Sequence, residues 1–403
     1  MISYSEANNI ISEEFRNLSR NTKEVELLSS LNRILAEEVY SDIKLPSFDN
    51  SAMDGYAIKF SEGKQKWKII GEISAGNYTS FSLTDETAIR IMTGGKLPEN
   101  CTTVVPVEDV KVEDTFVELT NSIKFKEGLN IRRKGDDIKD GQLALEKNTI
   151  ITSKHISAAA ACGKKKLKVF DKLNIAVLAT GDELIDIDEK PVGDKIRGSN
   201  LYSLLASINE MNMHPVNLGF VSDDKLELES KIKSALDNDI DILITTGGVS
   251  VGKYDYVPEI FEKLGVSIKF RKVNIKPGKP MIFGTFKKEN HPVFIIGLPG
   301  NPVSSFVGFH LFVKNNIYKR FGVDSQNNFN ANLLEDIRKN DDKRHFMRGL
   351  FRYNKELNKY FVEKLASQSS GNIVTTSKAN CLIVLEEDKK FIEKDESVEC
   401  IKI

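Results

Sequence analysis

Residues 241–255 combine a buried strand, a glycine-rich turn and the start of a helix. The apolar run 242–244 predicts the strand, and Pro258 stands where proline favours the first turn of a helix. Such a turn aims backbone N–H groups at an anion, because the first N–H groups of a helix have no partner within it. We expect phosphate binding here; the alternative is a tight connection without a ligand. The residues predicted to hold phosphate are Gly247, Gly248, Ser250 and Gly252.

The same turn matches the first seven positions of the P-loop pattern GxxxxGK[ST], from Gly247 to Lys253. The eighth position is Tyr254, whereas a P-loop needs a small hydroxyl there to hold Mg²⁺ beside the phosphates. The sequence therefore argues against a P-loop NTPase and favours another kind of phosphate-binding turn, closed by Asp255.

Acidic residues follow three predicted parallel strands at matching positions: Glu183, Asp224 and Asp255. Taken singly, each is explained as a solvated surface acid. Because the carboxyl ends of parallel strands meet at one edge of a sheet, we expect these three to lie close together. Carboxylates beside a phosphate suit Mg²⁺, which shares its coordination between a few protein oxygens, phosphate and water. The sequence therefore predicts Mg²⁺ as cofactor, held by these acids.

The segment 275–280 holds Lys276 and Lys279 apart on a Pro-Gly turn. Two lysines at a fixed spacing can bind an oxyanion; the alternative is an ordinary charged hairpin. No Ser–His or Cys–His nucleophile is visible, so attack is expected from water or from an oxygen of the substrate.

Composition narrows the class of protein. The 403 residues carry 57 Lys+Arg and 58 Asp+Glu, and this balance gives no electrostatic argument for nucleic-acid binding. The four cysteines are dispersed without a CxxC pair, which predicts a reducing cytoplasm and argues against a zinc site. We expect no signal peptide and no membrane-spanning helix.

Strands and helices alternate over residues 173–320, which predicts a doubly wound α/β domain with a parallel sheet. In it, Asn200 is expected to cap one helix. Helices are predicted at 3–19, capped by Ser3 or Ser5, at 23–39, and at 155–162, capped by Ser153. Short β-like runs predict an inserted β domain at 42–140, flanked by a split helical or linker domain (1–41 and 141–172). Residues 322–332 are expected to form a linker before a C-terminal β barrel or sandwich at 325–403.

Seven motifs in order resemble the molybdopterin molybdenumtransferase family (MoeA), and the equivalent domain of gephyrin is similar. They are DNSAMDGYA (49–57), IMTGG (91–95), RRKGDD (132–137), TGDEL (180–184), TTGGVSVGKYD (245–255), KPGKP (276–280) and LPGNPVS (298–304). MogA-type adenylyltransferases would share only residues 173–320, so the flanking β domains favour the transferase.

The resemblance implies an elongated four-domain subunit that forms a homodimer. It implies insertion of molybdenum from molybdate into adenylylated molybdopterin, with Mg²⁺-dependent release of AMP and with a MogA-type adenylyltransferase as a partner. The functional acids carried over are Asp54, Asp137, Glu183, Asp224 and Asp255. The substrate-binding residues carried over are Thr93, Lys276, Lys279, Pro280, Pro299 and Pro302, with a looser match at Arg348, Ser369 and Ser370.

Lys253 departs from the family, which often has an acid nearby. Two other readings are an adenylyltransferase that consumes ATP and a gephyrin-like binding scaffold. In an elongated subunit, the acids of the β insert could not reach the acids of the α/β sheet. We therefore expect a two-fold dimer in which each site is shared between subunits.

Overall fold

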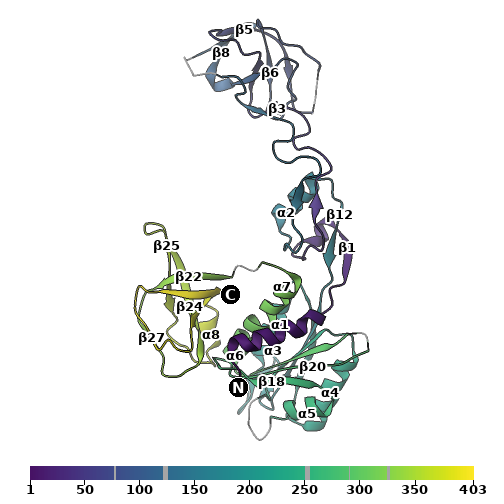
Figure 1. The fold of residues 1–403 in the computed structure, drawn as a ribbon, viewed down its shortest axis with the longest axis vertical. Helices are drawn as coiled ribbons and strands as arrows, with labels where there is room; N and C mark the ends of the chain where they lie inside the picture. Colours follow the sequence, from purple (N-terminus) through teal and green to yellow (C-terminus); the bar gives the residue numbers. More distant parts are fainter. Residues whose placement is uncertain (77–78, 121–125, 250–254, 290, 325–326) are drawn as a thin grey trace.

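The computed structural model describes residues 1–76, 79–120, 126–249, 255–289, 291–324 and 327–403. Figure 1 shows an elongated chain: the α/β region and the C-terminal β region lie together at one end, and the inserted β region lies at the other. A small connecting region joins the two ends. The residue boundaries predicted for the four domains stay predictions.

A six-stranded sheet forms the centre of the α/β region. Its first four strands pair in parallel, which confirms the predicted fold, and its last two pair antiparallel at one edge. The strand order is β16 (His214–Val221), β13 (Asn174–Thr180), β17 (Ile242–Thr246), β21 (Val293–Leu298), β20 (Pro280–Phe286) and β18 (Ser267–Lys272).

Helices cover both faces of this sheet. Ile242 and Ile244 of β17 pack in one hydrophobic core, and Leu243 between them packs in another. Because both faces are covered, every residue of β17 and β21 is buried. The first core includes α1 (Tyr4–Glu14), α3 (Ser199–Glu210), α6 (Pro302–Gly308), a π-helical segment (Phe309–Lys314) and α7 (Asn315–Phe321); the second includes α4 (Lys225–Asp237) and α5 (Val257–Lys263).

The first predicted helix is confirmed in α1, where the Ser3 hydroxyl accepts the Glu6 N–H. A 3-10 turn (Phe15–Asn17) extends it. Although the sequence grouped this helix with the connecting region, it packs on the α/β sheet. The helix predicted at 23–39 is wrong. Residues Thr22–Glu26 form β1, which pairs antiparallel with β12 (Lys166–Phe170).

The apolar residues that suggested that helix share no buried face, since Leu28 is 80% exposed and Leu35 is buried. The competing interaction is a strand pairing across more than 130 residues, which local periodicity cannot show. The connecting region also contains a 3-10 turn (Leu27–Ser30), β2 (Val39–Tyr40) paired with β11 (Leu143–Leu145), and α2 (Ser153–Ala161), whose cap is Thr152 rather than Ser153.

The inserted β region is confirmed. A short pair, β3 (Asn50–Ser51) with β10 (Ile131–Arg132), joins the DNSAMDGYA and RRKGDD motifs. A 3-10 turn spans Val107–Asp109. The main sheet has the order β7 (Thr103–Pro106), β4 (Gly55–Ile58), β6 (Thr87–Ile91), β5 (Lys66–Ile73), β9 (Phe116–Leu119) and β8 (Val110–Glu113).

The C-terminal region is a closed five-stranded barrel, in which each strand pairs with two others of the ring. The ring is β24 (Arg344–Asn354), β25 (Lys359–Lys364), β22 (Asn328–Leu333), β28 (Ser397–Lys402) and β26 (Cys381–Leu385). Because β22 begins at Asn328, the connection before it is shorter than the predicted linker.

Short elements complete the structure. Strand β19 (Ile275–Lys276) of the α/β region pairs in parallel with β24 of the barrel. The others are β14 (Leu184–Ile185) with β15 (Ile196–Arg197), β23 (Ile337–Arg338) with β27 (Phe391–Ile392), and α8 (Ile373–Thr376). Across the described ranges, no helix has the length and apolar character needed to cross a membrane.

Candidate active site

A cavity of about 830 Å³ lies at the carboxyl edge of the parallel sheet. The ends of three strands line it through Thr180, Thr246 and Pro299, and the first residues of α3 and α6 line it as well. The N-terminus of α3 therefore meets the cavity, and such a terminus favours anions because its first N–H groups have no partner within the helix. The start of α6 contributes less to anion binding, because Pro302 has no N–H and the Val303 N–H donates to the Ser370 carbonyl.

The glycine turn lies against the end of β13. Gly247 has φ +98°, and a Cβ there would come within 2.3 Å of the Thr180 carbonyl oxygen. Gly248 has φ +63° and would contact Val257 at 2.8 Å. Both positions therefore require glycine. Both line the cavity, and their predicted role in phosphate binding stays a prediction; Ser250, Gly252 and Lys253 lie outside the described residues.

Two of the three predicted sheet-edge acids, Glu183 and Asp255, line the cavity. The third, Asp224, is exposed and caps α4, its Oδ1 accepting the Leu226 N–H at 3.0 Å and the Glu227 N–H at 2.8 Å. Its neighbour Asp223 lines the cavity instead. The role of Asp224 in metal binding stays a prediction.

Asp223 is the acid that sequence reasoning missed. Burial raises the pKa of its carboxyl, and the charges of Asp182, Glu183 and Asp255 raise it further. The Asp182 carboxylate accepts the Asp223 N–H at 2.9 Å, which fixes the two loops against each other. The sequence does show two consecutive acids, Asp223 and Asp224, at this position. The alternation of the preceding strand does not reveal which of the two carboxylates faces the sheet edge.

The donor set suits Mg²⁺ in its chemistry. Among the described residues, no group of three or more His, Cys, Asp or Glu side chains is arranged to hold a metal by itself. Mg²⁺ needs few protein carboxylates when phosphate oxygens complete its coordination. A cation among Glu183, Asp223 and Asp255 would also relieve the repulsion that raises the Asp223 pKa.

Asn200 joins two walls of the cavity. Its Nδ2 donates to Thr246 Oγ1 at 3.0 Å and to the Gly300 carbonyl at 2.7 Å. The prediction that Asn200 caps α3 is wrong, because the cap position is Gly198. The side chain instead holds the turn of the LPGNP motif, whose Pro299 and Pro302 line the cavity; their role in substrate binding stays a prediction.

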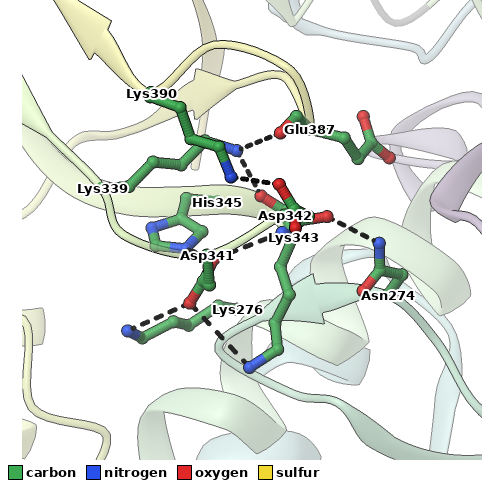
Figure 2. Close-up of polar contacts among 9 residues, drawn as sticks. All are labelled: Asn274, Lys276, Lys339, Asp341, Asp342, Lys343, His345, Glu387 and Lys390. Atoms are coloured by element: carbon green, nitrogen blue, oxygen red, sulfur yellow. Dashed lines mark hydrogen bonds and ion pairs between the residues drawn. The ribbon is translucent and has the colours of Figure 1, made fainter.

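The lysine motif reaches the cavity through Pro280, which lines it. Within the described part of the chain, Lys276 and Lys279 are not among the lining residues. The Lys276 side chain is 60% exposed, and its Nζ lies 3.7 Å from Asp341 Oδ2 of the barrel, as Figure 2 shows. A Cβ at Gly278 would lie 3.6 Å from the Ser304 carbonyl oxygen, so the motif packs beside the start of α6.

Arg348 is buried and holds a loop of the barrel. Its guanidinium donates at 2.9 Å to the carbonyls of Ser367, Ser369 and Asn372 and to Thr376 Oγ1. This loop closes one side of the cavity, because the Ser370 carbonyl accepts the Val303 N–H at 3.1 Å and Gly371 lines the cavity. Arg348 therefore shapes the cavity wall; direct molybdate binding by Arg348, Ser369 or Ser370 stays a prediction.

The inserted region, which carries Asp54 and Asp137, lies at the opposite end of the elongated chain from the α/β region whose sheet edge forms the cavity (Figure 1). Asp54 Oδ1 accepts the N–H and the hydroxyl of Thr93, both at 2.7 Å, and these bonds lower the pKa of Asp54. Asp137 pairs with Arg132 at 2.6 Å. The fold thus brings Glu183, Asp223 and Asp255 to one edge of the α/β sheet. It pairs Asp54 with Thr93, and Asp137 with Arg132, in the inserted region.

Comparisons with known proteins cover nearly the whole chain. Residues 2–163 match the MoeA N-terminal region (domain I and II), residues 176–319 a probable molybdopterin binding domain, and residues 330–403 the MoeA C-terminal region (domain IV). A Haemophilus influenzae protein named molybdopterin molybdenumtransferase is 35% identical over 386 residues, covering 94% of this chain and 93% of that protein.

A Bacillus subtilis protein of the same name is 31% identical over 393 residues, covering 95% of this chain and 90% of that protein. Among solved structures, a molybdopterin biosynthesis moeA protein from Pyrococcus horikoshii OT3 aligns over all of both chains. Its TM-score is 0.82 at 26% sequence identity.

Proposed function

The chain belongs to the molybdopterin molybdenumtransferase family, and we propose that it inserts molybdenum from molybdate into adenylylated molybdopterin, with Mg²⁺-dependent release of AMP. The observation that carries this proposal is the cavity at the sheet edge. There a glycine turn, the N-terminus of α3 and three carboxylates surround one space. Together they suit a substrate that carries a phosphoanhydride.

In this proposal, the turn at Gly248 and the start of α3 bind the phosphates through backbone N–H groups. Glu183, Asp223 and Asp255 would supply carboxylate oxygens to Mg²⁺ beside the phosphates, whose oxygens would complete the coordination, and Asp224 supports this edge through the start of α4. Bound there, Mg²⁺ supplies charge neutralisation for the leaving AMP. The P–O bond of the anhydride breaks as water or a molybdate oxygen attacks the phosphorus.

Molybdate is a tetrahedral dianion, and Lys276 and Lys279 supply the charges that bind it in this proposal. Pro280, Pro299 and Pro302 shape the wall between the lysine motif and the phosphate end of the cavity. In this proposal, molybdate held by the lysines beside this wall approaches the dithiolene sulfurs of the pterin past Pro280.

The site is completed by a second subunit in this proposal. The separation of the inserted region from the sheet in Figure 1 supports it, because Asp54, Thr93 and Asp137 cannot reach their own chain's cavity. A two-fold dimer presents the insert of each chain to the sheet of the other. A MogA-type adenylyltransferase in the same cytoplasm would supply the adenylylated substrate.

The test is incubation of the purified protein with adenylylated molybdopterin, with and without molybdate and Mg²⁺. We expect AMP release and transfer of active cofactor to an apo-molybdoenzyme only when all components are present. AMP release without formation of cofactor would contradict the proposal. Consumption of ATP with molybdopterin would also contradict it and would favour an adenylyltransferase.

A further inference from the structure

The backbone of the lysine motif is held by the C-terminal barrel. Strand β19 pairs with β24, so Ile275 lies opposite Arg344 and Lys276 lies opposite His345. The Arg344 N–H donates to the Asn274 carbonyl at 3.1 Å, and Asn274 Nδ2 donates to the Asp342 carbonyl at 2.8 Å. The position of Lys276 therefore depends on residues that lie about 70 positions later in the chain.

Asp341 is the acid that faces Lys276 from the barrel, and one of its oxygens is fixed. The buried His345 donates its Nε2–H to Asp341 Oδ1 at 2.7 Å, and the Lys343 N–H donates to the same oxygen at 3.2 Å. Figure 2 shows the carboxylate between the imidazole and two lysines. Its orientation is set by the barrel before any ligand binds.

The other oxygen, Oδ2, faces two ammonium groups. Lys276 Nζ lies 3.7 Å away and Lys343 Nζ lies 3.9 Å away. Burial tends to raise the pKa of Asp341, but the His345 and Lys343 hydrogen bonds and the charge of Lys276 lower it to about 2, so the carboxylate stays ionised. The two ammonium groups face a single carboxylate, so Lys276, Lys343 and Asp341 together carry a net positive charge that attracts an anion.

A lysine on a flexible four-carbon chain loses rotational freedom when it binds an anion. A fixed carboxylate that already restrains the ammonium reduces that loss. We propose that Asp341, held in place by His345, is a positioning residue that orients Lys276 for molybdate. This inference rests on the proposed function, in which Lys276 binds molybdate.

The test measures the KM for molybdate and the kcat of AMP release in Asp341→Asn, Lys276→Met and the double variant. For Asp341→Asn we expect KM to rise about threefold, the size set by one partly exposed ion pair, with kcat within about twofold of wild type. In the Lys276→Met background, Asp341→Asn should change KM no further, because the side chain that it positions is gone.

Asp342→Asn is the matched control. Asp342 is the next residue, is 88% exposed in its side chain and pairs with Lys390 rather than Lys276. We expect wild-type KM and kcat from this variant. His345→Leu should reproduce the KM rise of Asp341→Asn, because the carboxylate loses its fixed orientation.

Three results would overturn the positioning role: an unchanged KM in Asp341→Asn, a lower KM, which would show that Asp341 competes with molybdate, or a KM rise that persists in the Lys276→Met background. If Lys276→Met alone leaves KM unchanged, the molybdate-binding role of Lys276 in the proposed function fails, and the positioning role fails with it. A KM effect in Lys276→Met without one in Asp341→Asn removes only the positioning role.

Discussion

Asp223 and Asp224 are consecutive carboxylates with different surroundings: Asp223 lines the cavity at the sheet edge, whereas Asp224 caps α4. Asp224 is the cap residue at which α4 begins, and Asp223 precedes it in the loop. A difference of one position in the chain therefore determines which of the two acids faces the cavity. Asp224 accepts two backbone N–H groups, while the pKa of Asp223 is raised by burial and by three neighbouring acids.

We predict different effects for the two acids. Asp223→Asn should lower AMP release at least about tenfold, because a negative charge next to the proposed Mg²⁺ is lost. Asp224→Asn keeps a good cap and should leave stability nearly unchanged, while Asp224→Ala should cost about 1 kcal/mol of unfolding free energy. Activity assays and denaturant unfolding of the three variants check this. A larger activity loss in Asp224→Asn than in Asp223→Asn would favour Asp224 as the metal ligand.

The glycine turn resembles a P-loop, and its lysine provides a second prediction. Lys279→Ala should lose molybdate-dependent turnover, because this lysine belongs to the proposed oxyanion site. Lys253→Ala should retain most activity, since the sequence argues against a P-loop. Turnover at saturating and limiting molybdate separates the two variants. Equal and large losses in both would contradict the rejection of a P-loop.

The sequence predicted the sheet because its central strands are short apolar runs and its connections are helices. Residues 242–244 and 293–296 are recognisable in this way, and β17 and β21 confirm them. The helix predicted at 23–39 was wrong because its first residues, 23–26, pair with β12, a partner that lies more than 130 positions later. The spacing of apolar residues predicts the type of secondary structure only when that structure is set by neighbours in the sequence, and not when it is set by pairing with a distant strand.

The candidate site was predictable to the level of loops rather than single side chains. Glu183 and Asp255 follow strands and line the cavity, as the parallel sheet requires. Asp223 and Asn200 could not be identified, because the direction of a side chain at the first turn of a helix depends on where the helix begins. The contact between Lys276 and Asp341 depends on how the barrel packs against the α/β region, which no local pattern indicates.

His310 provides a prediction about pH. It is buried beside Phe306, and burial lowers its pKa to about 3. The folded protein therefore binds this proton less well than the unfolded chain, whose histidine titrates near 6.5. The contribution of neutral His310 to the unfolding free energy is fully present above pH 6.5 and is lost as the pH falls toward 3. Between pH 7 and pH 5 the loss should be about 2 kcal/mol.

The variant His310→Phe tests this pH dependence. Within the described residues, His310 Nε2 has no hydrogen-bond partner, so an apolar ring of similar shape should be tolerated at pH 7. We expect unfolding free energies of the variant to fall less between pH 7 and pH 5 than those of wild type. Parallel curves for the two proteins would show that His310 is not the group that titrates.

Arg348 provides a prediction about the loop at the cavity wall. Arg348→Ala leaves three loop carbonyls without their donor and should cost about 2–4 kcal/mol of unfolding free energy. Arg348→Lys should not restore it, because an ammonium cannot reproduce the planar fork. The control is Arg352→Ala on the same strand, where an exposed pair with Glu363 should contribute less than about 1 kcal/mol. Equal losses at both positions would contradict a structural role specific to Arg348.

The measurement that tests the shared active site most directly is the activity of mixed dimers of Asp54→Ala and Asp255→Ala. Asp54 belongs to the inserted region and Asp255 to the edge of the α/β sheet, and these two regions form the opposite ends of the elongated subunit. Each homodimer should be inactive. In a mixed dimer with shared sites, one site collects both substitutions and the other collects neither, so activity should return to roughly half of wild type. A mixed dimer that is properly formed and still inactive would contradict the account, because every site would then be built from a single chain.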